Sequence, residues 1–176
     1  MSSLLDRMVR AARLDVQLYE EVEADAGATP QAAAVVLLAS VAAGIGLGGF
    51  GIGDVLLVAI GALIGWVIWA ALTYFIGTQL LPEAETQADV GQLMRTIGFS
   101  SAPGVLRILA IVPGLAWFVL AVTGVWMLVA MVIAVRQALD YRSTGRAVAV
   151  CVIGFIAQII VFFLFTSMII TPAAIP

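Results

Sequence analysis

VGQLMRTIGFSSAPGVLRILAIV, residues 90–112, is the stretch that decides how the rest of the chain can fold. It is the least hydrophobic of the long apolar segments, with Arg95 and Arg107 near its ends and Pro103 in its middle. An arginine within a bilayer is costly unless other helices or water shelter it. We therefore expect residues 90–112 to lie at the centre of a helical bundle, with the more apolar segments around them.

Small and polar residues follow a helical spacing in the same stretch. Gly98 with Ala102, and Ser100 with Gly104, are small residues four apart, which allow neighbouring helices to approach closely. Pro103 lacks an amide donor and is expected to kink the helix. Serines next to such a kink can bond the freed backbone groups. Adding Gln158, a polar residue at the midpoint of the last apolar segment, gives a candidate intramembrane polar and packing site of Arg95, Gly98, Ser100, Ser101, Pro103, Arg107 and Gln158.

The two arginines of this stretch have two possible roles. They could line a polar path, or they could snorkel to opposite membrane interfaces, because a spacing of 12 residues is about 18 Å along a helix. The stretch itself could cross the membrane fully or dip in and return. A full crossing keeps the later arginines on one side of the membrane.

The composition of the chain requires a membrane environment. Of 176 residues, 63% are hydrophobic and 11% charged, and the mean hydropathy is +1.15; about 25% charged residues is usual in soluble domains. We expect an all-α, polytopic bundle of five transmembrane helices, with Gly61 and Gly65 forming a close helix crossing. The expected spans are residues 31–49, 55–77, 90–112, 115–135 and 147–170, followed by a short tail, 171–176.

Residues 1–30 form a distinct N-terminal region ahead of the expected 31–170 membrane domain. Residues 2–13 predict an amphipathic helix, with Leu4, Leu5, Met8 and Val9 on one arc and Arg7, Arg10 and Arg13 on the other. Such a helix could lie in the headgroup layer, or it could pack on the protein's own loops. Residues 14–29 are acidic and are expected to be a solvated segment before the first span.

The residue types that are missing narrow the chemistry. The chain has no histidine and one cysteine, Cys151, so it contains no Ser-His-Asp or Cys-His arrangement. No acid lies inside an expected span, and no basic tract suggests nucleic acid. We expect no enzymatic activity, no cofactor, no metal site and no small-molecule substrate that the sequence identifies.

The distribution of arginines predicts the orientation. With five spans and a cytoplasmic N-terminus, only Arg107 falls outside the cell. The arginines on the cytoplasmic side are then Arg7, Arg10, Arg13, Arg95, Arg136, Arg142 and Arg146. We expect a prokaryotic cytoplasmic (inner) membrane protein with its C-terminus external.

Four segments, in this order, resemble the prokaryotic branch of the Yip-domain family, relatives of the Ypt/Rab-GTPase-interacting membrane proteins. They are LYEEVEAD (18–25), GWVIWAALTYFIG (65–77), RTIGFSSAPGVLRIL (95–109) and VAMVIAVRQALDYRSTGRAVAV (129–150). The resemblance implies five spans and a cytoplasmic N-terminus, and it supplies no catalytic residue.

Three functions remain open from the sequence. The first is a non-enzymatic scaffold or adaptor that recruits protein partners or shapes the bilayer. The second is an accessory subunit of a larger membrane complex, and the third is a small transporter or channel. The expected partners are the lipid bilayer and either other proteins or further copies of the chain.

Overall fold

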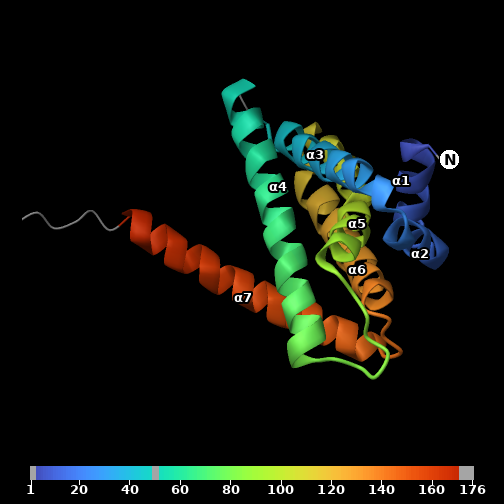
Figure 1. Ribbon diagram of the computed structural model, residues 1–176. Coiled ribbons are helices and arrows are strands. Elements are labelled where there is room, and N and C mark those ends of the chain that lie inside the picture. The colour runs from blue at the N-terminus through green and yellow to red at the C-terminus, as the bar shows by residue number, and fades with distance from the viewer. Residues whose placement is uncertain (1–2, 49–51, 171–176) are drawn as a thin grey trace, which may run out of the picture.

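The computed structural model describes residues 3–48 and 52–170, and every regular element within them is helical (Figure 1). Residues 1–2 and 49–51 and the expected tail, 171–176, lie outside the described residues. The elements are α1 Leu4–Ala12, α2 Val16–Ala24, the 3₁₀ turn η1 Ala26–Ala28, α3 Thr29–Gly46, α4 Ile52–Phe75, the π-helical turn η2 Ile76–Leu80, α5 Val90–Ser100, the 3₁₀ helix η3 Ala102–Ile111, α6 Ala116–Ala138 and α7 Thr144–Ile170.

The centre of the bundle is formed by α3, the α5–η3 segment and α6. α3 packs against the end of α5 and against η3, and glycines permit the close approach. A Cβ atom at Gly98 would lie 2.7 Å from the Ala32 Cβ, and one at Gly104 would lie 3.1 Å from the Ala39 Cβ. Residues 90–111 therefore occupy the sheltered central position that their arginines predicted.

The α-helix of this central segment ends before the proline. Ser101 N–H donates to Gly98 O at 3.2 Å, and Gly104 N–H donates to Ser101 O at 2.8 Å, so the chain tightens to 3₁₀ spacing around Pro103. Pro103 has no N–H to continue an α-helix. The start of α5 is fixed by a capping box, in which Asp89 and Gln92 bond each other's backbone amides.

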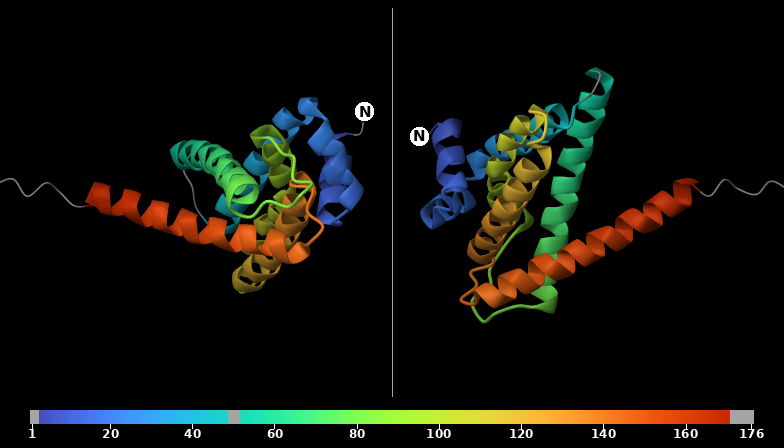
Figure 2. Two further views of the ribbon diagram at one scale, coloured as in Figure 1. Left: turned by 60° about the horizontal axis from the view of Figure 1, so that its bottom comes forward. Right: turned by 180° about the vertical axis from the view of Figure 1, so that it is seen from behind.

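α4 and α7 lie at the periphery. α7 begins beside the ends of α4 and α6 and then diverges from the bundle, as the two views of Figure 2 show. Its first half is held by Trp69 of α4, whose ring centroid lies 4.6 Å from that of Phe155. Among the side chains that the structure describes beyond Phe155, Ile159 is 66% and Phe163 70% exposed.

Four helices of the described chain are long and apolar enough to cross a membrane: 26–46, 55–80, 116–138 and 144–161. They correspond to the first, second, fourth and fifth expected spans. The third expected span, 90–112, is not among them, because its α-helix stops at Ser100. The protein is an integral membrane protein with a helical bundle that contacts lipid.

The acidic segment 14–29 differs from the expected solvated segment. Its helix α2 buries an apolar face against α5 and α6, and Leu18, Tyr19 and Val22 are fully buried. Its outer face remains accessible and includes the exposed acids Glu20 and Glu21. The N-terminal region is thus part of the folded core rather than a tether.

Candidate functional site

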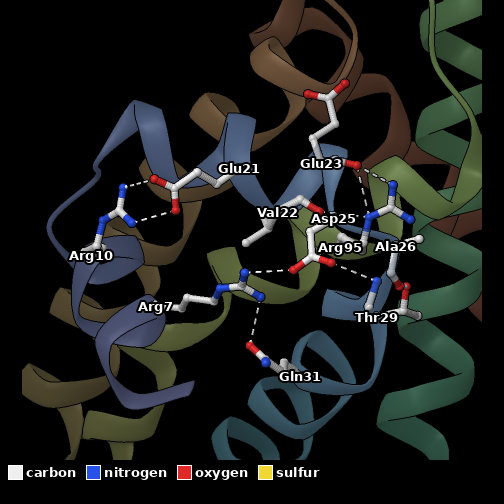
Figure 3. A network of polar contacts seen from close by, with 11 residues as sticks. Arg7, Arg10, Glu21, Val22, Glu23, Asp25, Ala26, Thr29, Gln31 and Arg95 are labelled. Carbon is white, nitrogen blue, oxygen red and sulfur yellow. Dashed lines mark hydrogen bonds and ion pairs between the residues drawn. The ribbon is translucent and has the colours of Figure 1, made fainter. Parts of the chain in front are cut away.

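Arg95 joins the N-terminal region to the bundle. Its guanidinium, 8% exposed, donates from Nε to Val22 O at 2.9 Å and Glu23 O at 3.2 Å, and from Nη2 to Glu23 O (Figure 3). These carbonyls belong to the last turn of α2, where a helix lacks internal donors and its dipole favours a cation. Arg95 therefore caps α2.

Arg7 attaches α1 to the same junction. Its Nη2 lies 2.8 Å from Asp25 Oδ2 and its Nη1 lies 3.1 Å from Gln31 Oε1 (Figure 3). Asp25 also accepts from Gly27 N–H at 3.0 Å, so one carboxylate orders η1 and holds α1. The sequence placed Arg7 on an outward polar face, whereas the structure buries it at 8% exposure.

Arg10 closes the turn between α1 and α2. It bonds Asp15 at 2.7 Å and Glu21 through two nitrogens at 2.7 and 2.8 Å. Arg13, the third arginine of the expected polar arc, is exposed at the end of α1. Hydrogen bonds from Arg10 lower the pKa of the Asp15 and Glu21 carboxyls, and the bond from Arg7 lowers that of Asp25.

The apolar arc of α1 is divided between two environments. Leu4 and Met8 pack against the core, while Leu5 is 70% and Val9 42% exposed. Trp126 of α6 donates to Ala12 O at 2.8 Å and fixes the end of the helix. Of the two expected roles for α1, the structure shows packing on the protein itself, with one apolar edge left outward.

Glu23 is the titrating group of this junction. Burial, together with the nearby carboxylates of Asp140 and Glu20, raises its pKa to about 7 against the opposing effect of Arg95. A carboxyl with this pKa changes charge near neutral pH. Its position on α2 couples the proton to the contact between α2, α5 and α6.

The remaining candidates on α5 and η3 serve packing. Gly98 lies against α3, and Pro103 is fully buried. Ser100, 1% exposed, donates to Ile97 O at 2.7 Å, as expected for a serine beside a helix break. These residues and Arg95 line neither of the cavities that border the central segment.

The other candidate site residues border two small cavities. One, of about 290 Å³, is bordered by Ser101 and Arg107; the second, of about 220 Å³, is bordered by Ser101, Gly65 and Gln158. Ser40 and Val36 border both, so the two cavities are neighbours along α3. The structure thus brings Ser101, Arg107 and Gln158 together through these spaces and leaves Arg95 apart.

The glycine pair of α4 does not form the expected close crossing. A Cβ atom added at Gly61 or Gly65 would meet nothing within 4 Å in the described structure. Gly61 lies on the exposed face of α4, and Gly65 borders a cavity. The close approaches are made by Gly46, Gly77, Gly98 and Gly104, because α3 and the α5–η3 segment hold the centre.

Sequence reasoning missed Tyr141, which ties the start of α7 to the end of α4. Its hydroxyl lies 2.9 Å from Gly77 O and 2.7 Å from Leu81 O. Burial raises its pKa to about 12. The signal available in the sequence was a tyrosine directly after a helix end, where backbone carbonyls need donors.

The described residues carry no arrangement typical of metal chemistry, since no group of three or more His, Cys, Asp or Glu side chains is gathered there. The geometry offers a charged junction of α1, α2 and α5 and, within the bundle, small cavities with a few polar residues on mostly apolar walls. The junction can hold helices together and the cavities can bind a ligand. Neither arrangement presents a nucleophile next to a base.

One of three comparisons with known proteins gave a match. Searches of curated proteins and of solved structures found no match. The family model of the Yip1 domain matches residues 22–166, from the last turns of α2 to beyond the middle of α7. This match covers most of the 176 residues, including the Arg95 junction and both cavities, and the chain belongs to the Yip1 domain family.

Proposed function

We propose that this protein is a non-enzymatic membrane scaffold, in which α1 and α2 form a rigid cap that presents a surface to partner proteins and to lipid headgroups. The observation that carries the proposal is the junction at Arg95 and Arg7, which orders the N-terminal region on the bundle. The outward edge of Leu5 and Val9, four residues apart, is the surface offered.

The experiment is an affinity purification of the full chain from native membranes in mild detergent, with partners identified by mass spectrometry and the particle mass measured. Leu5→Ser with Val9→Ser is compared with Asp6→Asn, a change on an exposed polar residue of the same helix. We expect the double variant to lose partners or alter membrane shape and Asp6→Asn to keep both. An unchanged partner profile and membrane morphology in the double variant would contradict the scaffold.

An accessory-subunit role is the second candidate, and the position of α7 favours it. An apolar cavity of about 690 Å³ lies between α6 and α7, bordered by Leu128, Ile133, Val148 and Phe155 among others. A neighbouring helix from a larger complex suits this V-shaped gap. Recovery of a fixed-stoichiometry membrane complex supports this role, whereas a particle of one or several copies of the chain alone argues against it.

We further propose that residues 90–111 cross the membrane, which makes five spans. Eleven residues of α5 rise about 16 Å and ten residues of η3 about 20 Å, and together they exceed the ~30 Å hydrocarbon layer. This segment also runs beside α3, itself long enough to span. The 3₁₀ geometry lengthens the segment, so a break in the α-helix does not shorten its reach.

Five spans place the termini on opposite sides of the membrane. Arg95 lies at the end of α2 and Arg142 lies in the turn after α6, where it meets Glu85, while Arg107 lies beside Gly46 at the end of α3. The arginine excess favours a cytoplasmic N-terminus. Protease protection of an N-terminal tag in right-side-out spheroplasts, with cleavage of a C-terminal tag, tests it; two tags on one side would reject the five-span topology.

A further inference from the structure

The cavity beside Arg107 combines one cation with apolar walls. It measures about 290 Å³ and lies between α3, α4, η3 and α6. Its polar border consists of Ser40, Ser101 and Arg107, and the rest is small or apolar, including Ala43, Leu47, Val58 and Met127. A space of this composition suits a molecule with a negative head and a hydrocarbon tail.

Arg107 is partly buried, and its charge is not neutralised within the described chain. Its Nε donates to Thr123 Oγ1 at 3.3 Å, a long and therefore weak contact, and that hydroxyl donates onward to Val119 O at 2.7 Å. No described carboxylate lies within 4.0 Å of the guanidinium. A guanidinium has five N–H donors, so most of its hydrogen-bonding capacity is left for a ligand.

Arg107 lies near the end of the central segment. Four residues of 3₁₀ helix separate it from the end of η3 at Ile111, a rise of about 8 Å. An arginine stem can extend over this distance toward the headgroup layer. The backbone of Arg107 is held in place by α3, because Gly46 lies directly against its carbonyl oxygen.

We propose that this cavity binds one anionic phospholipid, with the phosphate on Arg107 and Ser101 and an acyl chain along Ala43, Leu47 and Val58. Arginine and phosphate match in geometry, since the guanidinium offers parallel donors to two oxygens. A net negative headgroup is favoured over a zwitterionic one, because the cation has no other counter-charge among the described residues. The site is separate from the α1–α2 cap and does not depend on the scaffold role.

Native mass spectrometry of the full chain in neutral detergent tests the proposal, with phosphatidylglycerol and phosphatidylcholine of identical acyl chains as probes. We expect one phosphatidylglycerol to be retained in preference to phosphatidylcholine. Arg107→Gln should weaken that retention by about tenfold or more, and Arg107→Lys by less. Arg142→Gln, at an exposed arginine far from the cavity, is the matched control and should retain lipid as the wild type does.

A second variant guards against loss of folding. Ala43→Leu fills the cavity and leaves Arg107 in place, so it should reduce retention while the melting temperature stays close to that of the wild type. Equal retention of phosphatidylglycerol by the wild type and Arg107→Gln, or equal retention of the two lipids by the wild type, would overturn the proposal. Millimolar inorganic phosphate is the remaining probe: if it stabilises the wild type through Arg107 while no lipid is retained, the ligand is a free anion and the lipid assignment is wrong.

Discussion

The guanidinium of Arg95 lies 2.9 Å from the carbonyl oxygen of Val22, a residue 73 positions earlier in the chain. This contact, with those to Glu23, closes the end of α2 onto the central helix. The Arg95 cation, which would be costly in lipid, lies against the carbonyl end of the α2 dipole, which favours a positive charge. The same relationship makes the acidic N-terminal segment part of the membrane domain.

Removing this tether should release the N-terminal cap. We expect Arg95→Ala to lower the free energy of unfolding by about 2–4 kcal/mol, because buried carbonyl groups lose their donors. Arg95→Lys should lower the free energy of unfolding by less, because a single ammonium group replaces only some of the guanidinium donors. Limited proteolysis within residues 3–25 and tryptophan-fluorescence melting in detergent measure the change. Arg142→Ala, whose side chain is 79% exposed, should cost no more than about 1 kcal/mol.

The pKa of Glu23 predicts that the cap weakens as the pH rises. Its folded value of about 7 exceeds the ordinary 4.5, so the folded state binds more protons between these values. The contribution of the neutral Glu23 carboxyl to the free energy of unfolding is fully present below about pH 4.5. It is lost as the pH rises through about 7. Relative to Glu23→Gln, the wild type should lose on the order of 1–2 kcal/mol between about pH 5 and pH 8. Parallel melting curves of the two proteins over this range would refute the coupling.

Gly46 and Gly61 form a matched pair for testing the packing. A Cβ at Gly46 would overlap the Arg107 carbonyl, whereas one at Gly61 would meet open space. We expect Gly46→Ala to destabilise the bundle by about 3 kcal/mol. Gly61→Ala should instead stabilise it by about 0.5–1 kcal/mol through helix propensity. Thermal melting of both variants decides, and equal effects would mean that α3 and η3 do not touch as described.

Thr73 is a buried polar group that the fold does not use. It is 1% exposed, and its hydroxyl has no hydrogen-bond partner among the described residues. Thr73→Val keeps the shape and removes the unsatisfied group, so the melting temperature should rise, by the equivalent of about 1–2 kcal/mol. Thr78→Val is the control, because Thr78 donates to Tyr74 O at 2.8 Å and its replacement should give no gain. A fall in stability for Thr73→Val would show that this hydroxyl has a partner.

Tyr141 should be needed for the attachment of α7 to α4. Tyr141→Phe leaves the carbonyls of Gly77 and Leu81 without their shared donor, and a loss of about 1–2 kcal/mol is expected. Hydrogen exchange should then increase at residues 76–81 and at the start of α7. If hydrogen-exchange protection at both places equals that of the wild type, the attachment of α7 to α4 depends on packing and not on the Tyr141 hydroxyl.

The sequence by itself determined the membrane class, the helical fold and four helices long enough to span. These follow from local quantities, since length, apolar content and proline position act within one segment. The break near Pro103 was predictable for the same reason, and the central place of residues 90–112 followed from two arginines that lipid does not shelter. The arc of Leu4, Leu5, Met8 and Val9 correctly indicated a helix, and nothing local could say which side of it faced the protein.

Tertiary structure alone decided what the polar residues touch. Arg95 reaches carbonyls 73 positions away, Arg7 turns inward to Asp25, and Gly61 remains open while Gly46 is packed. A helical period assigns residues to faces, but the neighbour of each face depends on how distant helices are arranged. In a bilayer the outer faces are apolar as well, so hydrophobicity does not separate packing faces from lipid faces. Packing faces are instead distinguished by close backbone approach and by hydrogen-bond donors at helix ends. Both features arise only when the chain is folded.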